Sequence, residues 1–439
     1  MNVEKIAFAC KKVASPVAYC ALSIKTGTRY EPAQYNGLAH LLEHMLFKGT
    51  AKRTSNSINN VLEREGGELN AYTTKEEIVL CATILREDLP KAVDLLAELA
   101  FTSTFPKKEL EKELDVIYDE IISYKDSPAE SIYDHFETLL FQGHPLEKAI
   151  LGEKKTLKKI NPHILNEFLT TNFTPSNMVY TVVGNIEEAE FQKLVQKSVN
   201  KYYRCQEQDQ EDTENCRQRS SIIEAIPNRE LERDPDYETE NRRIESEGCT
   251  SLTIGTPFKL ELAKRNHQAH CIIGTSAYSY SDGTRRIALA LIANILGGPA
   301  SISRLNNILR EKHALVYNIE ANFTPYSDTG IFSIYFGCDK SLLAKCKELV
   351  YKELEKMVSV PLSDRELKNA KKQFLGQLFI SQDNAESQCL AMGKSIMVYG
   401  KMYPFEQTRK QIEQLTADQL QQVAQEVLSE VRLSELVYR

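Results

Sequence analysis

Two histidines and a glutamate lie close together near the start of the chain. His40 and His44 are four residues apart, and Glu43 directly precedes the second histidine. Residues four apart on a helix lie one turn above each other on the same face. The two imidazoles can therefore bind one metal ion together, with Glu43 beside them. The pentapeptide reads H-x-x-E-H, the reverse of the more common H-E-x-x-H order of zinc sites.

The segment around these residues is otherwise apolar, and we expect a largely buried helix over 38–47. Unpaired polar groups inside a core are costly. A bound metal ion would account for histidines and a glutamate on such a helix. The alternative is two core histidines that happen to be four residues apart, because a pattern with three fixed positions is weak evidence by itself.

A third metal ligand has to come from another segment of the chain. A predicted acidic helix over 107–124 offers Glu113 and Glu120, which are seven residues apart. Seven residues correspond to two helical turns, so both side chains point the same way. Either glutamate could complete a site of two histidines and one glutamate, with a fourth position left for water. The alternative for this helix is an ordinary solvent-exposed acidic face.

The first half of the chain mixes strand and helix patterns without strict alternation. Segments rich in β-branched and aromatic residues predict strands at 17–26, 68–73, 77–84 and 177–183. Helical periodicity is found at 55–65, 88–101, 107–124, 129–140, 155–170 and 187–202. This arrangement favours the α+β class.

The second half repeats this plan. Strands are expected at 270–274, 316–324, 330–337 and 433–438, and helices at 284–296, 302–311, 340–357 and 363–397. The order matches that of residues 17–124, which indicates an internal duplication. When the two apolar helices are aligned, His40, Glu43 and His44 fall on Ala290, Ala293 and Asn294. The second copy therefore keeps the fold and lacks the metal ligands.

Composition separates the two halves and excludes some functions. Residues 204–247 hold fourteen acidic and seven basic side chains, which is typical of a solvated linker, with an acidic binding tail as the alternative. We predict domains at 1–204 and 248–439, joined by a linker at 205–247. The chain has 439 residues and a net charge of −7, so its composition argues against nucleic-acid binding.

Cysteine usage and hydropathy suggest a cytoplasmic location. The ten cysteines include no C-x-x-C pair, which fits reduced core cysteines. The first fifteen residues contain no apolar run typical of a signal peptide. No window reaches the 18 to 20 or so apolar residues of a membrane span.

Three motifs together resemble one enzyme family. They are H-x-x-E-H at 40–44, G-G-E-L-N-A-Y-T at 66–73, and a glutamate pair whose second member lies 76 residues past His44. This combination resembles the inverzincin, or pitrilysin/M16, metallopeptidases. The segment R-E-K-H-A-L-V-Y at 310–317 is similar to the arginine–tyrosine segment of the family's substrate-binding half. In length, the chain is similar to the short-subunit branch, which includes the mitochondrial processing peptidase and its bacterial relatives.

The resemblance implies a fold and a set of site residues. It implies two α/β-roll domains, each with a mixed, mainly antiparallel sheet packed with helices. His40, His44 and Glu120 would bind one zinc ion per chain, Glu43 would be the general base, and Glu113 would support the site. From the second half, Tyr317 would donate its hydroxyl to the developing oxyanion, and Arg310 would hold the substrate backbone.

The expected function is that of a zinc-dependent endopeptidase acting on unfolded peptides or short polypeptides. An exposed strand at 68–73 could pair with an extended peptide substrate, which makes Asn70, Ala71 and Tyr72 candidate contacts. The resemblance implies a chamber of four homologous domains, whereas this chain holds two. We therefore expect two chains to close around the substrate, as a homodimer or with a homologous partner, with Arg310 and Tyr317 acting in trans. The alternatives are a non-catalytic binding or assembly subunit, and the catalytic subunit of a heterodimer.

Overall fold

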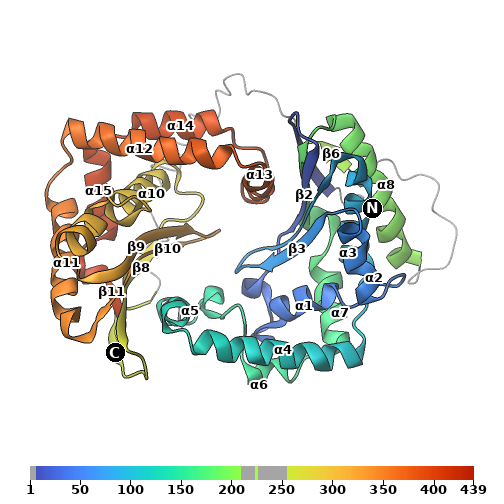
Figure 1. Cartoon of the computed structure of the whole chain (residues 1–439), viewed down its shortest axis with the longest axis horizontal. Helices are drawn as coiled ribbons and strands as arrows, with labels where there is room; N and C mark the ends of the chain where they lie inside the picture. The colour runs from blue at the N-terminus through green and yellow to red at the C-terminus, as the bar shows by residue number, and fades with distance from the viewer. Residues whose placement is uncertain (1–5, 209–222, 226–254) are drawn as a thin grey trace. The chain divides into compact units, whose positions relative to one another are not determined.

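The computed structural model describes residues 6–208, 223–225 and 255–439 (Figure 1). The chain divides into two compact units, each assembled from three segments of sequence. The first comprises Met1–Ile121, Lys148–Glu230 and Ile380–Tyr403, and the second comprises Ile122–Glu147, Leu231–Phe379 and Pro404–Arg439. Each unit contains one mixed sheet covered by helices, so the predicted α+β class is confirmed.

The sheet of the first unit has six strands in the order β3-β4-β2-β5-β1-β6. Their bounds are Glu68–Thr73, Ile78–Leu85, Val17–Ile24, Met178–Gly184, Ile6–Lys12 and Ile223–Ala225. Strand β1 runs parallel to β5 and β6, and the other pairs are antiparallel. Strand β5 is buried along its whole length, which fits a sequence that is apolar apart from Thr181 and lies inside the sheet. Strand β3 lies at the edge.

Helices cover both faces of this sheet (Figure 1). One face packs against a large core formed mainly by α1, α2, α3, α4, α7 and α8, with bounds Leu38–Leu46, Ser55–Glu63, Leu89–Thr102, Lys107–Lys125, Pro162–Asn172 and Glu188–Gln208. The opposite face packs against α13, Ala385–Tyr399, through a smaller apolar cluster. Gly393 permits this approach, because a Cβ there would lie 2.7 Å from the hydroxyl oxygen of Ser23.

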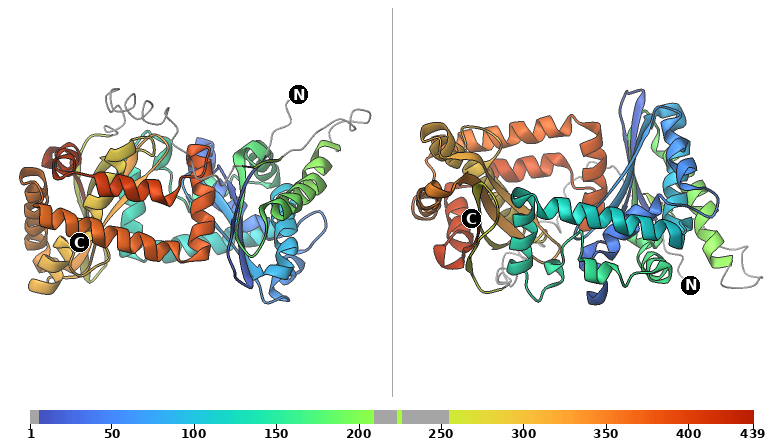
Figure 2. Two further views of the ribbon diagram at one scale, coloured as in Figure 1. Left: turned by 90° about the horizontal axis from the view of Figure 1, so that it is seen from above. Right: turned by 60° about the horizontal axis from the view of Figure 1, so that its bottom comes forward.

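The sheet of the second unit has five strands in the order β7-β11-β8-β10-β9. Their bounds are Lys259–Leu262, Ser434–Tyr438, Gln268–Ala277, Gly330–Asp339 and Val316–Pro325. This order matches β1-β5-β2-β4-β3 of the first unit strand for strand, so the predicted repeat of the fold is confirmed. Its core packs against α10, Gly283–Gly297, α11, Leu343–Ser359, and α15, Ala417–Val427. Figure 2 shows both sheets from two further directions.

Each sheet receives one covering helix from the other half of the sequence. Helix α5, Pro128–Leu140, packs on the second sheet through Ile132 and Phe136. Helix α13 lies in sequence between β10 and β11 of the second sheet and packs on the first sheet through Cys389 and Met392. The two helices occupy corresponding places in the repeat, so the exchange is reciprocal.

Three helices differ from the predicted ones. The expected helix 155–170 is divided into α6, Lys154–Leu157, and α7, because Asn161 caps the second helix and Pro162 occupies its first turn. The expected helix 363–397 is divided into α12, Asp364–Gln382, and α13, where the Asn384 side chain accepts a bond from the backbone N–H of Ser387. Most of the expected helix 302–311 lies in a wider π-helix, Asn306–Lys312.

Other expectations concern the linker and the membrane. The last turn of α8 and strand β6 occupy part of the expected linker 205–247, and its remaining residues lie outside the described residues. Strand β1 was not predicted.

No helix in the described part of the chain combines the length and apolar character needed to cross a membrane.

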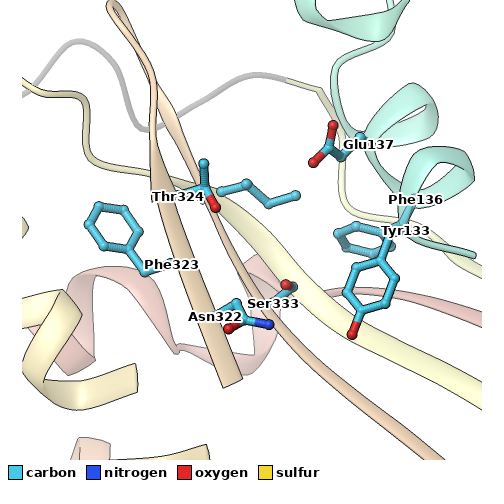
Figure 3. A pocket seen from close by; sticks show the side chains of 8 residues that line it. Tyr133, Phe136, Glu137, Asn322, Phe323, Thr324 and Ser333 are labelled. Atoms are coloured by element: carbon cyan, nitrogen blue, oxygen red, sulfur yellow. The ribbon is translucent and has the colours of Figure 1, made fainter. Parts of the chain in front are cut away.

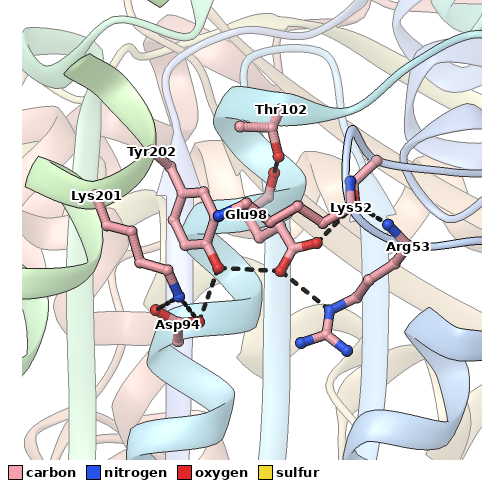
Figure 4. A network of polar contacts seen from close by, with 8 residues as sticks. Lys52, Arg53, Asp94, Glu98, Thr102, Lys201 and Tyr202 are labelled. Atoms are coloured by element: carbon pink, nitrogen blue, oxygen red, sulfur yellow. Dashed lines mark hydrogen bonds and ion pairs between the residues drawn. The ribbon is translucent and has the colours of Figure 1, made fainter. Parts of the chain in front are cut away.

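A buried polar network connects α3, α8 and the loop after α1 (Figure 4). The Glu98 side chain on α3 is 1% exposed. It accepts hydrogen bonds from the Thr50 hydroxyl at 2.6 Å and from Arg53 Nε at 3.1 Å. The hydroxyl of Tyr202 lies within hydrogen-bond distance of both Glu98 and Asp94. Glu98 is therefore the shared acceptor that holds the loop after α1 against the helices.

Replacing Glu98 by Ala is expected to lower the free energy of unfolding by about 2–4 kcal/mol, because Arg53 and two hydroxyls lose a buried acceptor. Urea denaturation followed by circular dichroism measures the change. Lys112→Ala removes only an exposed ion pair with Glu109 and should change the free energy by less than about 1 kcal/mol. Equal effects of the two variants would contradict a structural role for the network.

Candidate metal centre

Helix α1 and helix α4 bring three potential ligands together. The rings of His40 and His44 are 4.6 Å apart between centroids. Glu120 Oε2 lies 3.8 Å from His40 Nε2 and 3.9 Å from His44 Nε2. One ligand atom from each of the three residues lies within 4.8 Å of the others, and no second such group of three occurs among the described residues.

The donors of this cluster suit a zinc ion. Burial, with His44 close by, lowers the pKa of His40 to about 4, so its imidazole is neutral near pH 7 and can offer a lone pair. Two imidazole nitrogens and a carboxylate oxygen form a ligand set typical of catalytic zinc. The Glu120 side chain is 44% exposed, whereas the His40 side chain is 9% exposed. The cluster thus has a buried side and a side open to solvent.

Glu113 contacts the other ring nitrogen of His44. Its Oε2 lies 3.2 Å from His44 Nδ1, and its Oε1 lies 2.6 Å from the ammonium group of Lys48. Because a carboxylate can only accept, Nδ1 carries the hydrogen and Nε2 is left for a metal. Sequence reasoning missed Lys48, whose only signal is its position four residues after His44.

Glu43 is held by a residue of the edge strand. The hydroxyl of Thr73, the last residue of β3, donates to Glu43 Oε2 at 2.9 Å. Burial raises the pKa of Glu43, and the Thr73 hydrogen bond and nearby His44 oppose this rise. A raised pKa brings a carboxylate closer to the range that suits a general base. Sequence reasoning missed Thr73, although its place at the end of the predicted strand was a usable signal.

The candidate substrate residues lie next to Thr73 on β3. Asn70 is exposed, and Ala71 and Tyr72 are half-buried. Ala71 packs toward the core that contains α1, whereas Tyr72 packs toward the cluster that contains α13. Successive side chains therefore alternate between the two faces, and the feature shared by all three residues is the backbone edge of the sheet.

Arg310 and Tyr317 belong to the second unit. Arg310 is exposed on the π-helix, and Tyr317 is 63% exposed near the start of β9. The Tyr317 hydroxyl lies 3.5 Å from Asp339 Oδ1. Between them the chain turns at Ala314, whose φ is 49°. The cluster on α1 and α4 is formed by the first unit, and these two residues are not among its members.

The second unit holds the ligand-free copy of the metal helix. Ala290, Ala293 and Asn294 lie on α10. The Asn294 amide donates to Gln377 Oε1 at 2.6 Å, so the position corresponding to His44 makes a structural hydrogen bond.

The second unit also contains a small cavity beside its edge strand (Figure 3). It measures about 200 Å³ and lies between α5 and the hairpin of β9 and β10. Tyr133, Phe136 and Glu137 line one side, and Asn322, Phe323 and Thr324 line the other. None of the predicted site residues lines it.

Comparison with known proteins agrees with these observations. Residues 8–154 match the model of the insulinase family, peptidase family M16, and residues 159–374 match that of the peptidase M16 inactive domain. The chain is 30% identical over 408 residues to the uncharacterized zinc protease YmxG of Bacillus subtilis, covering 93% of this chain and 89% of that protein. It is also 29% identical to an uncharacterized zinc protease of Rickettsia felis, and the match covers 95% of this chain and 91% of that protein.

Solved structures show the same fold. A crystal structure described as a peptidase M16 inactive domain from Pseudomonas fluorescens matches with a TM-score of 0.81 and 17% identity, covering 100% of this chain and 96% of that one. The crystal structure of a protease from Helicobacter pylori matches with a TM-score of 0.81 and 18% identity. This match covers 98% of this chain and 96% of that one. Given the family models and the relative from Bacillus subtilis, the chain belongs to peptidase family M16.

Proposed function

We propose that this protein is a zinc-dependent endopeptidase that cleaves unfolded peptides or short polypeptides. The observation that supports this most directly is the convergence of His40, His44 and Glu120, with Glu43 beside them. Relatives described as zinc proteases give independent support. In this proposal the region 1–204 is catalytic and the region 248–439 binds substrate.

The chain's own residues would divide the chemistry between them. His40, His44 and Glu120 would hold a zinc ion, which would supply Lewis acidity to polarise a carbonyl and make water more acidic. Glu43 takes the proton from the attacking water and passes it to the leaving amine. Glu113 and Lys48 fix the orientation of the His44 ring.

The substrate would bind as an added strand along β3. The outer edge of β3 has no strand neighbour among the described residues, so its backbone groups can pair with an extended peptide. Backbone pairing is tolerant of sequence, which suits unfolded peptides. Asn70, Ala71 and Tyr72 would contact the substrate, and Thr73 places Glu43 at the end of the same strand.

Two chains would form the complete site. Arg310 and Tyr317 would act on substrate bound to the metal centre of a second chain, in a homodimer or with a homologous partner. Mixing a Glu43→Gln chain with a Tyr317→Phe chain tests this arrangement, because each mixed dimer retains one intact site. If mixed dimers form without recovering activity, the assignment in trans is wrong.

Zinc content and cleavage together test the enzyme itself. We expect one zinc per chain by elemental analysis and chelator-sensitive cleavage of a quenched peptide, restored by added zinc. A folded dimer with neither property would favour a non-catalytic binding or assembly subunit. An isolated chain that binds zinc but cleaves only after a homologous chain is added would favour the catalytic subunit of a heterodimer.

Replacing Thr73 by Val is expected to lower kcat by about ten- to a hundredfold, because Glu43 loses a hydrogen bond while the strand keeps a β-branched residue of the same shape. Steady-state cleavage of the quenched peptide measures this. Thr170→Val removes a hydroxyl that bonds only within α7 and should leave kcat unchanged. A wild-type kcat for Thr73→Val would remove Thr73 from the proposed site.

A further inference from the structure

The metal helix α1 begins without a capping side chain of its own. The first N–H groups of any helix have no partner within the helix and are usually satisfied by a Ser, Thr, Asp or Asn side chain at the N-cap. Here the N-cap is Gly37, whose φ is 94° and which has no side chain. Because the start of α1 is buried, its N–H groups need an acceptor from elsewhere in the protein.

Glu31 supplies this acceptor from six residues upstream of the N-cap. Its Oε1 accepts from the backbone N–H of Ala39 at 2.8 Å. Its Oε2 accepts from the backbone N–H of Gly37 at 3.1 Å and from the side-chain amide of Asn36 at 3.1 Å. The residue is 4% exposed, so water does not compete for these bonds. A carboxylate at this end of a helix also interacts favourably with the helix dipole.

The capped turn carries the first metal ligand. Ala39 directly precedes His40, and the chain from Gly37 to His40 forms the first turn of α1. A shift of this turn would move His40 relative to His44, which lies one turn further along, and relative to Glu120 on α4. We infer that Glu31 is a positioning residue for the metal centre, which acts by holding the first turn of α1. This inference rests on the proposed function, because it assumes that His40 binds zinc.

The segment that carries Glu31 also holds the turn after the edge strand. The backbone N–H of Arg29 donates to the carbonyl of Lys75 at 2.9 Å, and the Arg29 guanidinium pairs with Glu76 at 2.9 Å. Gly27 allows this approach, since a Cβ there would lie 2.4 Å from the carbonyl oxygen of Thr74. Residues 27–31 therefore tie the start of the metal helix to the turn that follows Thr73.

Two substitutions of Glu31 separate its shape from its role as an acceptor. Glu31→Gln keeps the side-chain volume but has only one acceptor oxygen. Its NH2 group, which can only donate, must then face the backbone N–H of either Ala39 or Gly37. Glu31→Ala removes both acceptors. The control is Glu435→Gln in the second unit, where a buried carboxylate accepts from Lys347 and Tyr351 and has no role in the metal centre.

The readouts are zinc affinity, measured by chelator competition, and the visible spectrum of the cobalt-substituted protein, which reports ligand geometry. We expect Glu31→Gln and Glu31→Ala to weaken zinc binding by about tenfold or more and to change the cobalt spectrum. Glu435→Gln should lower the unfolding temperature and leave both readouts unchanged. If Glu31→Ala does not fold, the inference is tested by Glu31→Gln and by hydrogen exchange in the wild-type protein. Exchange of the backbone N–H groups of Gly37 and Ala39 should be slow in the wild-type protein.

The outcomes distinguish this inference from the proposed function. Folded Glu31 variants with wild-type zinc affinity and cobalt spectrum would overturn the positioning role while the wild-type protein still binds zinc and cleaves peptide. Fast hydrogen exchange at Gly37 and Ala39 in the wild-type protein would also overturn it. If the wild-type protein binds no zinc, the proposed function fails and the positioning role fails with it.

Discussion

A Glu43→Gln variant is expected to retain one zinc per chain and to lose between about 10² and 10⁴ in kcat. The amide has nearly the shape of the carboxylate but cannot take a proton from water. Glu43 is not among the three clustered ligands, so the metal should remain bound. Zinc content from elemental analysis and kcat from peptide cleavage must be measured on the same preparation.

The control for this variant is Glu63→Gln, an exposed glutamate at the end of α2. It makes the same chemical change outside the site and should keep wild-type activity. Loss of zinc from Glu43→Gln would show that Glu43 holds the metal. Full activity with zinc bound would show that another group is the base.

A Glu120→Gln variant is expected to lose both zinc and activity. The neutral amide oxygen is a weaker metal ligand than a carboxylate, so the dissociation constant for zinc should rise. The rise should exceed the roughly 10- to 100-fold increase expected for Glu113→Gln, which alters only a residue that hydrogen-bonds a ligand. Chelator competition measures the constant for Glu120→Gln and Glu113→Gln side by side. Excess zinc should restore part of the activity of Glu113→Gln.

Glu111→Gln provides the matched control for this comparison. It alters an exposed carboxylate on the same helix α4 and should leave zinc affinity unchanged. If Glu113→Gln weakens zinc more than Glu120→Gln, the two glutamates have exchanged roles. The 3.2 Å contact of Glu113 with His44 Nδ1 argues that Glu113 orients the ring and that Glu120 is the ligand.

Local regularity predicted which side chains could form the metal cluster, whereas the choice of Glu120 over Glu113 as the third ligand came from the family resemblance. A spacing of four residues on one helix and seven on another determines which side chains face the same way, and both helices formed where periodicity placed them. The edge strand β3 was also predicted from its local composition. The repeat of the fold followed from the order of these elements.

Partners that arise only in the tertiary structure could not be predicted in the same way. Thr73 and Glu31 contact α1 from the edge strand and from the loop before the helix, and no periodic pattern marks them. Lys48 lies four residues after His44, but its contact with Glu113 depends on how α4 packs. Strand β1 was missed because its sequence ends in two lysines and its main partner β5 lies more than 160 residues away. The division of residues 363–397 was missed because both parts have helical sequences and only Asp383 and Asn384 separate them.

The reciprocal exchange of α5 and α13 has a consequence for how such a chain could arise by duplication. If each ancestral half had folded as a self-contained domain, its own helix would have covered its own sheet. In the present chain a half-length fragment would leave the apolar face around Val79 and Val179, or the one around Ile272 and Leu436, without its helix. The two halves are therefore interdependent for folding, and changes in one helix must stay compatible with a sheet encoded in the other half of the gene.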